Sequence, residues 1–162
     1  MRGGDLFTIL GTMFVALILS ILPIPNWAMG LRPEFMPLFL IFWSVSFPDR
    51  VGIGTAWIFG FILDLFRDGA IGGQYAFACT IVVFMSIKIH QRFRIYPIWQ
   101  QAVIIGFLIT LYQIALFIIK GMGGTLHDFG WRFWSTIITS MLVWPIIFIF
   151  LSGMQNRIKM SS

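Results

Sequence analysis

VGIGTAWIFGFILDLF, residues 51–66, is an apolar run of 16 residues that a single charge, Asp64, interrupts. Gly52, Ala56, Gly60 and Asp64 recur every four positions, so a helix places all four on one face. Three of the four are small, and small faces let the backbone of a neighbouring helix approach closely. The run therefore predicts a membrane-embedded helix in close contact with another helix, with Asp64 pointing into that contact.

A second small face follows after a short turn. Gly69 lies in this turn and can take a positive φ, which suits a tight reversal of the chain. Gly72, Ala76 and Thr80 then recur at every fourth position. The two segments together predict an antiparallel helical hairpin that packs closely.

Further apolar runs extend the pattern over the whole chain. Four of them cover residues 6–22, 70–87, 102–119 and 133–151. Each has 17 to 19 residues, and a helix that spans a bilayer needs about 17–25. One more run, residues 36–47, is only about 18 Å long as a helix, so it either extends back toward Pro33 or forms a half-helix. We expect about six transmembrane helices in one compact bundle, with residues 1–162 as a single membrane domain.

The composition argues for the same fold class, an all-α integral membrane protein. Of the 162 residues, 59% are hydrophobic and 10% are charged, whereas soluble domains have about 25% charged residues. So little charge cannot cover a surface that faces water. The lysines and arginines are scattered among short connections and form no stripe, which argues against a nucleic-acid-binding face.

The positions of the cations predict an orientation, because cytoplasmic loops are enriched in lysine and arginine. Six crossings with a cytoplasmic N-terminus place seven cations inside and four outside. The inside set is Arg2, Arg50, Lys88, Arg92, Arg94, Arg157 and Lys159, and the outside set is Arg32, Arg67, Lys120 and Arg132. Five crossings with an outside N-terminus give the same ratio. The C-terminus is cytoplasmic in both arrangements, and we favour the first, with a cytoplasmic N-terminus.

Residues for catalysis or cofactor binding are scarce. His90 and His127 are the only histidines, and the favoured topology places them on opposite sides of the membrane. Cys79 is the only cysteine, and no cluster of histidine, cysteine and carboxylate residues has the spacing of a metal site. Residues 52–55 lack the lysine of a phosphate-binding loop. We therefore predict no catalytic residue, no cofactor and no metal.

Asp64 has three candidate roles. A carboxylate at the centre of a span costs about 2.5–3.5 kcal/mol, so such residues usually face the interior of a bundle. The favoured role is structural, with Asp64 accepting hydrogen bonds from the turn at residues 67–73 or from the next helix. Binding of a ligand or proton and contact with a partner protein are the alternatives.

Several segments follow one another in a fixed order along nearly the whole chain: Arg32-Pro33, Pro48-Asp49-Arg50-Val51-Gly52-Ile53-Gly54-Thr55, Gly60-Phe61-Ile62-Leu63-Asp64-Leu65, Gly69 and Gly72, Trp99-Gln100-Gln101-Ala102, and Trp144-Pro145. Together they resemble the MreD family of bacterial rod shape-determining membrane proteins. The charged pair Arg67-Asp68 in the hairpin turn departs from the family's pattern.

The resemblance implies a bacterial inner-membrane protein of the cell-elongation machinery, the assembly that directs lateral peptidoglycan synthesis. It implies MreC as a partner, with RodA, its class B transpeptidase and MreB as further members of the assembly, in contact with membrane lipid. It also implies a fold similar to the substrate-binding subunits of energy-coupling-factor transporters. We expect a non-enzymatic scaffold whose candidate residues for partner contact are Arg32, Arg67, Arg92 and Arg94.

Two other functions stay open. A small-molecule binding or transport subunit of the energy-coupling-factor type would have a polar cavity near Asp64 and Gln113. An intramembrane enzyme would depend on His127 or Asp128.

Overall fold

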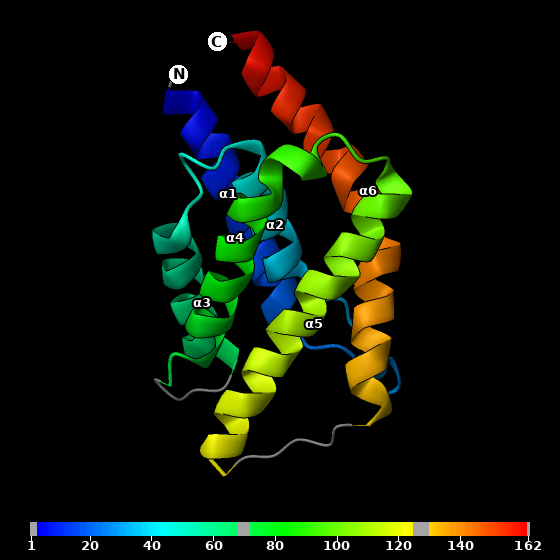
Figure 1. Ribbon diagram of the computed structural model, residues 1–162. Coiled ribbons are helices and arrows are strands. Elements are labelled where there is room, and N and C mark those ends of the chain that lie inside the picture. The colour runs from blue at the N-terminus through cyan, green and yellow to red at the C-terminus, as the bar shows by residue number, and fades with distance from the viewer. Residues whose placement is uncertain (1–2, 68–71, 125–129, 162) are drawn as a thin grey trace.

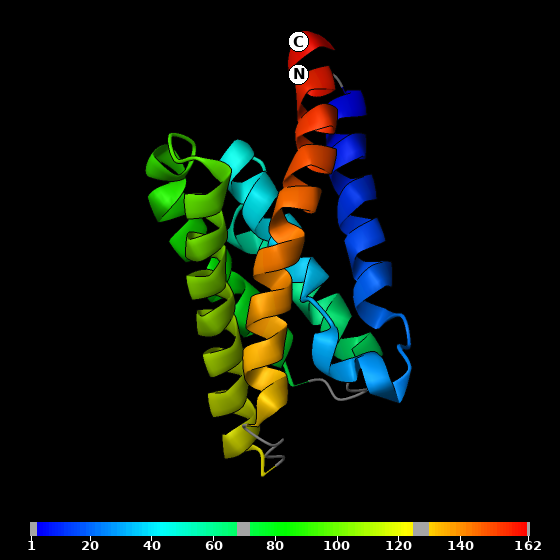
Figure 2. The same ribbon diagram turned by 90° about the vertical axis from the view of Figure 1, so that its right-hand side faces the viewer.

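The computed structural model describes residues 3–67, 72–124 and 130–161, and these residues form helices and short connections without a strand. The elements are α1 (Gly3–Ile21), the 3-10 helix η1 (Asn26–Leu31), α2 (Phe35–Ser46), α3 (Ile53–Arg67), α4 (Gln74–Phe93), α5 (Ile98–Met122) and α6 (Trp131–Ser161). The helices lie side by side and run roughly along one direction (Figures 1 and 2). The expected all-α architecture is confirmed over the described residues.

Helix length separates the six α-helices of the described ranges into two groups. α1, α4, α5 and α6 are long and apolar enough to cross a membrane. α2 and α3 have 12 and 15 residues. Their lengths of about 18 and 22 Å are less than the ~30 Å of a hydrocarbon core. The expectation of about six spans is thus met in part, by four helices of sufficient length and two shorter ones.

α2 lies in the middle of the other helices. It contacts α1, α4, α5 and α6, and every residue from Met36 to Ser46 is buried (Figures 1 and 2). A helix that is apolar on all sides is buried in protein, and one that does not face lipid need not match the thickness of the bilayer. This explains why so short an apolar run suffices. The helix begins at Phe35, so it does not extend back to Pro33.

Side chains of two other helices satisfy the beginning of α2. The first backbone N–H groups of a helix have no partner within it. The N–H of Met36 donates to Ser20 Oγ of α1 at 3.1 Å, and the N–H of Glu34 donates to Ser140 Oγ of α6 at 3.2 Å. Further along α2, Trp43 Nε1 donates to Thr12 Oγ1 of α1 at 2.9 Å. These buried hydrogen bonds fix the position of α2 along its own axis relative to α1 and α6.

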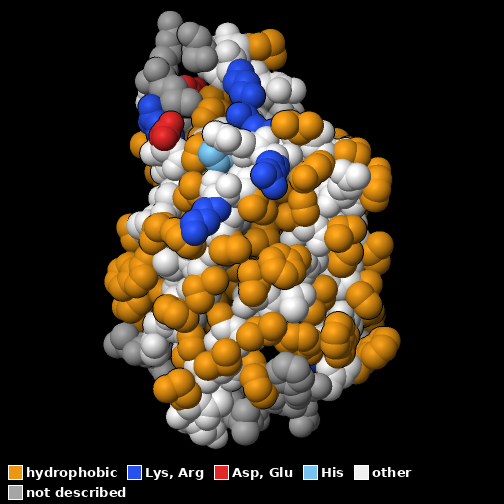
Figure 3. Space-filling model, in the orientation of Figure 1, with side chains coloured by type: hydrophobic (Ala, Val, Ile, Leu, Met, Phe, Trp, Pro, Cys, Tyr) orange, Lys and Arg blue, Asp and Glu red, His pale blue; other side chains and the backbone are white. Residues whose placement is uncertain are grey.

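Both termini lie at one end of the bundle, together with the connection between α4 and α5 (Figures 1 and 2). Shared placement of the termini requires an even number of crossings, as in the arrangement with six. Several basic side chains gather at the same end in Figure 3, while most of the face shown there is apolar. Which end faces the cytoplasm stays a prediction from the distribution of cations.

The contact between α3 and α4 centres on Gly60. A Cβ added to Gly60 would lie 2.5 Å from Ala76 Cα and 2.7 Å from the Tyr75 carbonyl oxygen. Ala56 and Ala76 are fully buried beside it. Only glycine at position 60 permits so close an approach of the two backbones.

Each of the two predicted small faces lacks its first residue in the structure. Gly52 precedes α3, and an added Cβ there would meet nothing within 4 Å. Gly72 precedes α4, and an added Cβ would meet the nearby side chain of Gln74 at 3.3 Å. The expectation that these two glycines lie in the helix contact is therefore wrong, because the helices begin after them. Gly69 lies outside the described residues.

Asp64 of α3 caps the beginning of α4. Its Oδ1 accepts a hydrogen bond from the Tyr75 N–H at 3.0 Å, and its Oδ2 accepts one from the Ala76 N–H at 3.4 Å. The residue at the N-cap position of α4 is Gly73, with φ +66° and no side chain to offer. An aspartate at an N-cap normally accepts from these same second and third N–H groups. Here the carboxylate comes from the preceding helix and is only 1% exposed.

Replacement of Gly60 by alanine tests the close contact. Gly60→Ala is expected to lower the free energy of unfolding by about 1–3 kcal/mol, because the new methyl group meets backbone atoms that cannot move aside. Gly54→Ala in the same helix is the matched control, since an added Cβ there meets nothing within 4 Å. Unfolding in sodium dodecyl sulfate, followed by tryptophan fluorescence, measures both. Equal stability of the two variants would contradict the contact.

Replacement of Asp64 tests the cap. Asp64→Ala is expected to destabilise the protein by about 1–3 kcal/mol, because it leaves two buried N–H groups without their acceptor. Asp64→Asn keeps one acceptor oxygen and should lose less. Asp49→Asn, at an exposed position between α2 and α3, controls for the loss of charge. The same unfolding measurement applies, and wild-type stability of Asp64→Ala would exclude the capping role.

Candidate functional site

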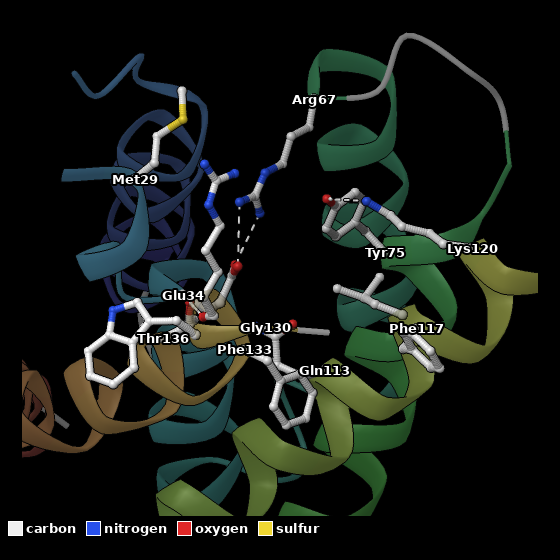
Figure 4. A pocket seen from close by; sticks show the side chains of 13 residues that line it. Met29, Glu34, Arg67, Tyr75, Gln113, Phe117, Lys120, Gly130, Phe133 and Thr136 are labelled. Carbon is white, nitrogen blue, oxygen red and sulfur yellow. Dashed lines mark hydrogen bonds and ion pairs between the residues drawn. The ribbon is translucent and has the colours of Figure 1, made fainter. Parts of the chain in front are cut away.

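A cavity of about 890 Å³ opens among the helix ends that lie opposite the termini. Its lining comes from η1, the start of α2, the end of α3, the start of α4, the second half of α5 and the start of α6. The lining residues are Met29, Glu34, Arg67, Tyr75, Gln113, Leu116, Phe117, Lys120, Gly130, Trp131, Arg132, Phe133 and Thr136. Figure 4 shows the labelled side chains of this set around the open space.

An ion pair between Glu34 and Arg67 connects the start of α2 to the end of α3. Arg67 Nη1 lies 3.1 Å from Glu34 Oε2, and Nη2 lies 3.4 Å from Oε1. Two parallel N–H to oxygen contacts of this kind combine charge with a fixed geometry. Glu34 is only 7% exposed. The pair therefore holds a guanidinium group at the cavity wall (Figure 4).

Tyr75 brings a second cation close to Arg67. Its ring centre lies 5.2 Å from Arg67 Cζ and 5.1 Å from Lys120 Nζ. Lys120 Nζ also donates to the Tyr75 hydroxyl at 3.2 Å (Figure 4). Aromatic rings attract cations at such distances. One ring from α4 thus holds a cation from α3 and another from α5.

Arg32 lies near this group and ties α2 to the end of α1. Its Nη2 donates to the backbone carbonyl of Ser20 and to that of Leu19, the latter at 3.4 Å. Burial of the guanidinium lowers the pKa of Arg32, and the positive charge of Arg67 lowers it further, while Glu34 partly offsets both. Arg32, Arg67 and Lys120, which the sequence analysis assigned to the outer side, therefore lie close together in the structure.

The cavity lining carries an excess of positive charge. Three of its side chains are cationic, those of Arg67, Lys120 and Arg132, and Glu34 is its one carboxylate among the described residues. Over the lining residues that the structure describes, the formal excess is therefore two positive charges. Gln113 and Thr136 add polar atoms to the wall. Such a lining can bind an anion and offer it hydrogen bonds.

The four arginines expected to contact partners fall into two pairs. Arg32 and Arg67 make the internal contacts described above. Arg92 and Arg94 are exposed where α4 ends, at the end of the bundle that holds the termini. The sequence pattern did not distinguish the pairs, because the groups that contact Arg32 and Arg67 lie eight or more positions away along the chain.

The remaining candidates are separated in the structure. Gln113 lines the cavity, whereas Asp64 lies outside its lining and binds the start of α4. His127 and Asp128 lie outside the described residues. Within the described ranges, no group of three or more histidine, cysteine, aspartate or glutamate residues could hold a metal ion. The sequence analysis did not anticipate the pairing of Glu34 with Arg67, because a contact across 33 positions leaves no local pattern.

Comparison with known proteins gives a consistent result. The family model for rod shape-determining protein MreD matches residues 2–154. Rod shape-determining protein MreD of Haemophilus influenzae is 24% identical over 156 residues, which cover 95% of this chain and 94% of that protein. No solved structure matches, so the similarity to energy-coupling-factor subunits stays a prediction. Because the match covers nearly its whole length, the chain belongs to the MreD family of membrane proteins, which act in the determination of rod shape.

Proposed function

We propose that this protein is a non-enzymatic scaffold of the bacterial cell-elongation complex, located in the inner membrane, where it binds MreC and supports lateral peptidoglycan synthesis. Further partners in this proposal are RodA, its class B transpeptidase and MreB. The observation that carries the proposal is the family match over residues 2–154. That match covers the membrane helices themselves, so the shared function depends on this helical region.

The surfaces available to partners follow from the fold. α1 and α3 expose large apolar side chains along their outer faces, among them Phe7, Phe14 and Trp57. Lipid can cover these faces, and so can a membrane-crossing helix of another protein, since packing between helices within a bilayer depends on shape rather than on hydrophobicity. We propose that MreC contacts the protein through such a face.

A second surface lies at the end that holds the termini. α6 has 31 residues and is about 46 Å long, which exceeds a hydrocarbon core of ~30 Å. Its last part, together with the start of α1, extends past α2, α3, α4 and α5 (Figure 1) and carries exposed Arg157. Ser161 Oγ lies 3.3 Å from Asp5 Oδ1, which keeps this projection beside α1. Together with exposed Arg92 and Arg94, it offers a basic surface to a cytoplasmic partner or to anionic lipid.

Binding of a small molecule is a second candidate function. The cavity of about 890 Å³ favours it, because ligand sites usually have volumes of about 300–1,000 Å³ and a few converging polar groups. Both functions can reside in one protein, since the cavity and the surfaces proposed for partners involve different residues.

Depletion of the protein from a rod-shaped host tests the elongation role. Cells are expected to become round, because lateral wall synthesis would lose a component, and the tagged wild-type protein should restore the rod shape and recover MreC on purification. Cell shape and MreC recovery are scored in the same cultures. Cells that stay rod-shaped, together with no recovery of MreC, would overturn the proposal.

Charge changes at the end of α4 test the basic surface. The double variant Arg92→Glu/Arg94→Glu is expected to lower the recovery of assembly members several-fold, because it reverses the charge offered to a partner. Arg92→Lys/Arg94→Lys is the matched control, since it keeps the charge and should behave as wild type. Unchanged recovery with the reversed charges would assign these arginines to lipid contact alone.

A further inference from the structure

The cavity holds more positive charge than its structural contacts require. Glu34 pairs directly with Arg67, and Lys120 lies in the last turn of α5, where a cation stabilises the carbonyl end of a helix. Among the described residues, Arg132 has neither a carboxylate partner nor a place at the carbonyl end of a helix. It lies in the first turn of α6, where the helix dipole is itself positive and a further cation is unfavourable.

The start of α6 adds to the positive electrostatic potential of the cavity. Gly130, Trp131, Arg132 and Phe133 line the cavity with the first turn of a 31-residue helix. The first N–H groups of a helix lack a carbonyl partner four residues earlier in the helix and attract anions, phosphate above all. In α6, the Phe133 N–H donates to the Gly130 carbonyl at 3.1 Å. A helix start and three cationic side chains therefore surround one space. An anion in that space would offset the repulsion among them.

Much of the rest of the lining is apolar or aromatic. Met29, Leu116, Phe117 and Phe133 share the wall with the cations. A small hydrophilic anion would leave these side chains unused. An anion attached to an apolar body would contact both parts of the lining.

Tryptophans place the cavity at the depth of lipid headgroups. Trp131, which lines it, is 77% exposed, and Trp27 of η1 and Trp134 of α6 are exposed at the same end of the bundle. Exposed tryptophans in membrane proteins concentrate at the boundary between hydrocarbon and water. The space between the helices thus opens at the level where phosphate groups of lipids lie.

We propose that this cavity binds the phosphate group of an anionic amphiphile, with Arg132, Lys120 and Arg67 around the phosphate and the aromatic lining around the apolar part. This inference deepens the second proposed function and does not depend on the elongation role. The proposed ligand class is a phosphate ester that is covalently attached to an apolar group. A membrane phospholipid and a soluble organic phosphate both supply that chemistry, and the bilayer depth of the cavity favours the phospholipid.

Lipid binding to the purified full-length protein tests the proposal. The protein is placed in nanodiscs of phosphatidylcholine, phosphatidylglycerol is added in steps, and native mass spectrometry counts the lipids retained. We expect one phosphatidylglycerol to bind in preference to phosphatidylcholine. Arg132→Gln should weaken this binding about tenfold, because hydrogen bonds between charged groups are among the stronger ones. Arg50→Gln removes the same charge from the exposed connection between α2 and α3, at the opposite end, and should bind as wild type.

A second arm separates the two sources of phosphate. Inorganic phosphate and glycerol phosphate are added to the protein in phosphatidylcholine alone, and thermal unfolding is recorded. Stabilisation that Arg132→Gln abolishes and Arg50→Gln retains would support the phosphate site with a soluble ligand as its source. No stabilisation, together with selective retention of phosphatidylglycerol, would support the lipid.

The proposal is overturned if neither ligand binds, or if the two variants weaken lipid binding equally, since equal loss indicates general attraction to anionic lipid. A photoactivatable phosphatidylglycerol gives an independent measurement on the unaltered protein. Cross-links are expected in the segments that line the cavity, at the end of α5 and the start of α6. Cross-links confined to the end that holds the termini would contradict the site. Because these measurements use the isolated protein, a negative result leaves the elongation proposal standing.

Discussion

Enclosure of α2 is the constraint on which the rest of the structure depends. A helix of 12 residues cannot cross a hydrocarbon core by itself, so other helices must shield its apolar sides and satisfy its ends. α1, α4, α5 and α6 surround it, and Ser20 and Ser140 accept hydrogen bonds from the N–H groups at its start. The cavity follows from the same mismatch in length. Glu34, directly before α2, lines a space that the longer α5 and α6 extend past and enclose.

The contact between α3 and α4 makes the burial of a carboxylate within the bundle possible. Burial of Asp64 is unfavourable unless hydrogen bonds compensate it. The start of α4 supplies two N–H donors, and the positive end of its dipole favours a negative charge there. Gly60 permits the approach that brings the carboxylate within reach of them. Close packing and capping are therefore two consequences of one contact. The glycine at the N-cap of α4 makes the aspartate of the neighbouring helix necessary.

The sequence predicted well what depends on local period and poorly what depends on distant pairing. Apolar runs predicted the helices, and the four-residue spacing predicted the face that carries Gly60 and Asp64. Gly52 and Gly72 share that spacing but precede their helices, because spacing alone does not mark where a helix begins. The 12 residues of α2 gave no indication of its central position, since enclosure is a property of the neighbours. Glu34 and Arg67 belong to different segments, and their pairing exists only in the assembled bundle.

The two ends of the bundle hold their positive charge in different ways, and this bears on the orientation predicted from the sequence. At the end with the termini, Arg92, Arg94 and Arg157 are exposed. At the opposite end, Arg67 pairs with a carboxylate, and Arg32 binds the carbonyls that end α1. A simple count of seven cations against four treats all of them as equal. The positive-inside tendency concerns cations in the connecting loops, and internal contacts account for part of the smaller set. The asymmetry between the ends is therefore greater than the count suggests. Arg67, Lys120 and Arg132 line the cavity, and Arg32 binds the end of α1 beside it.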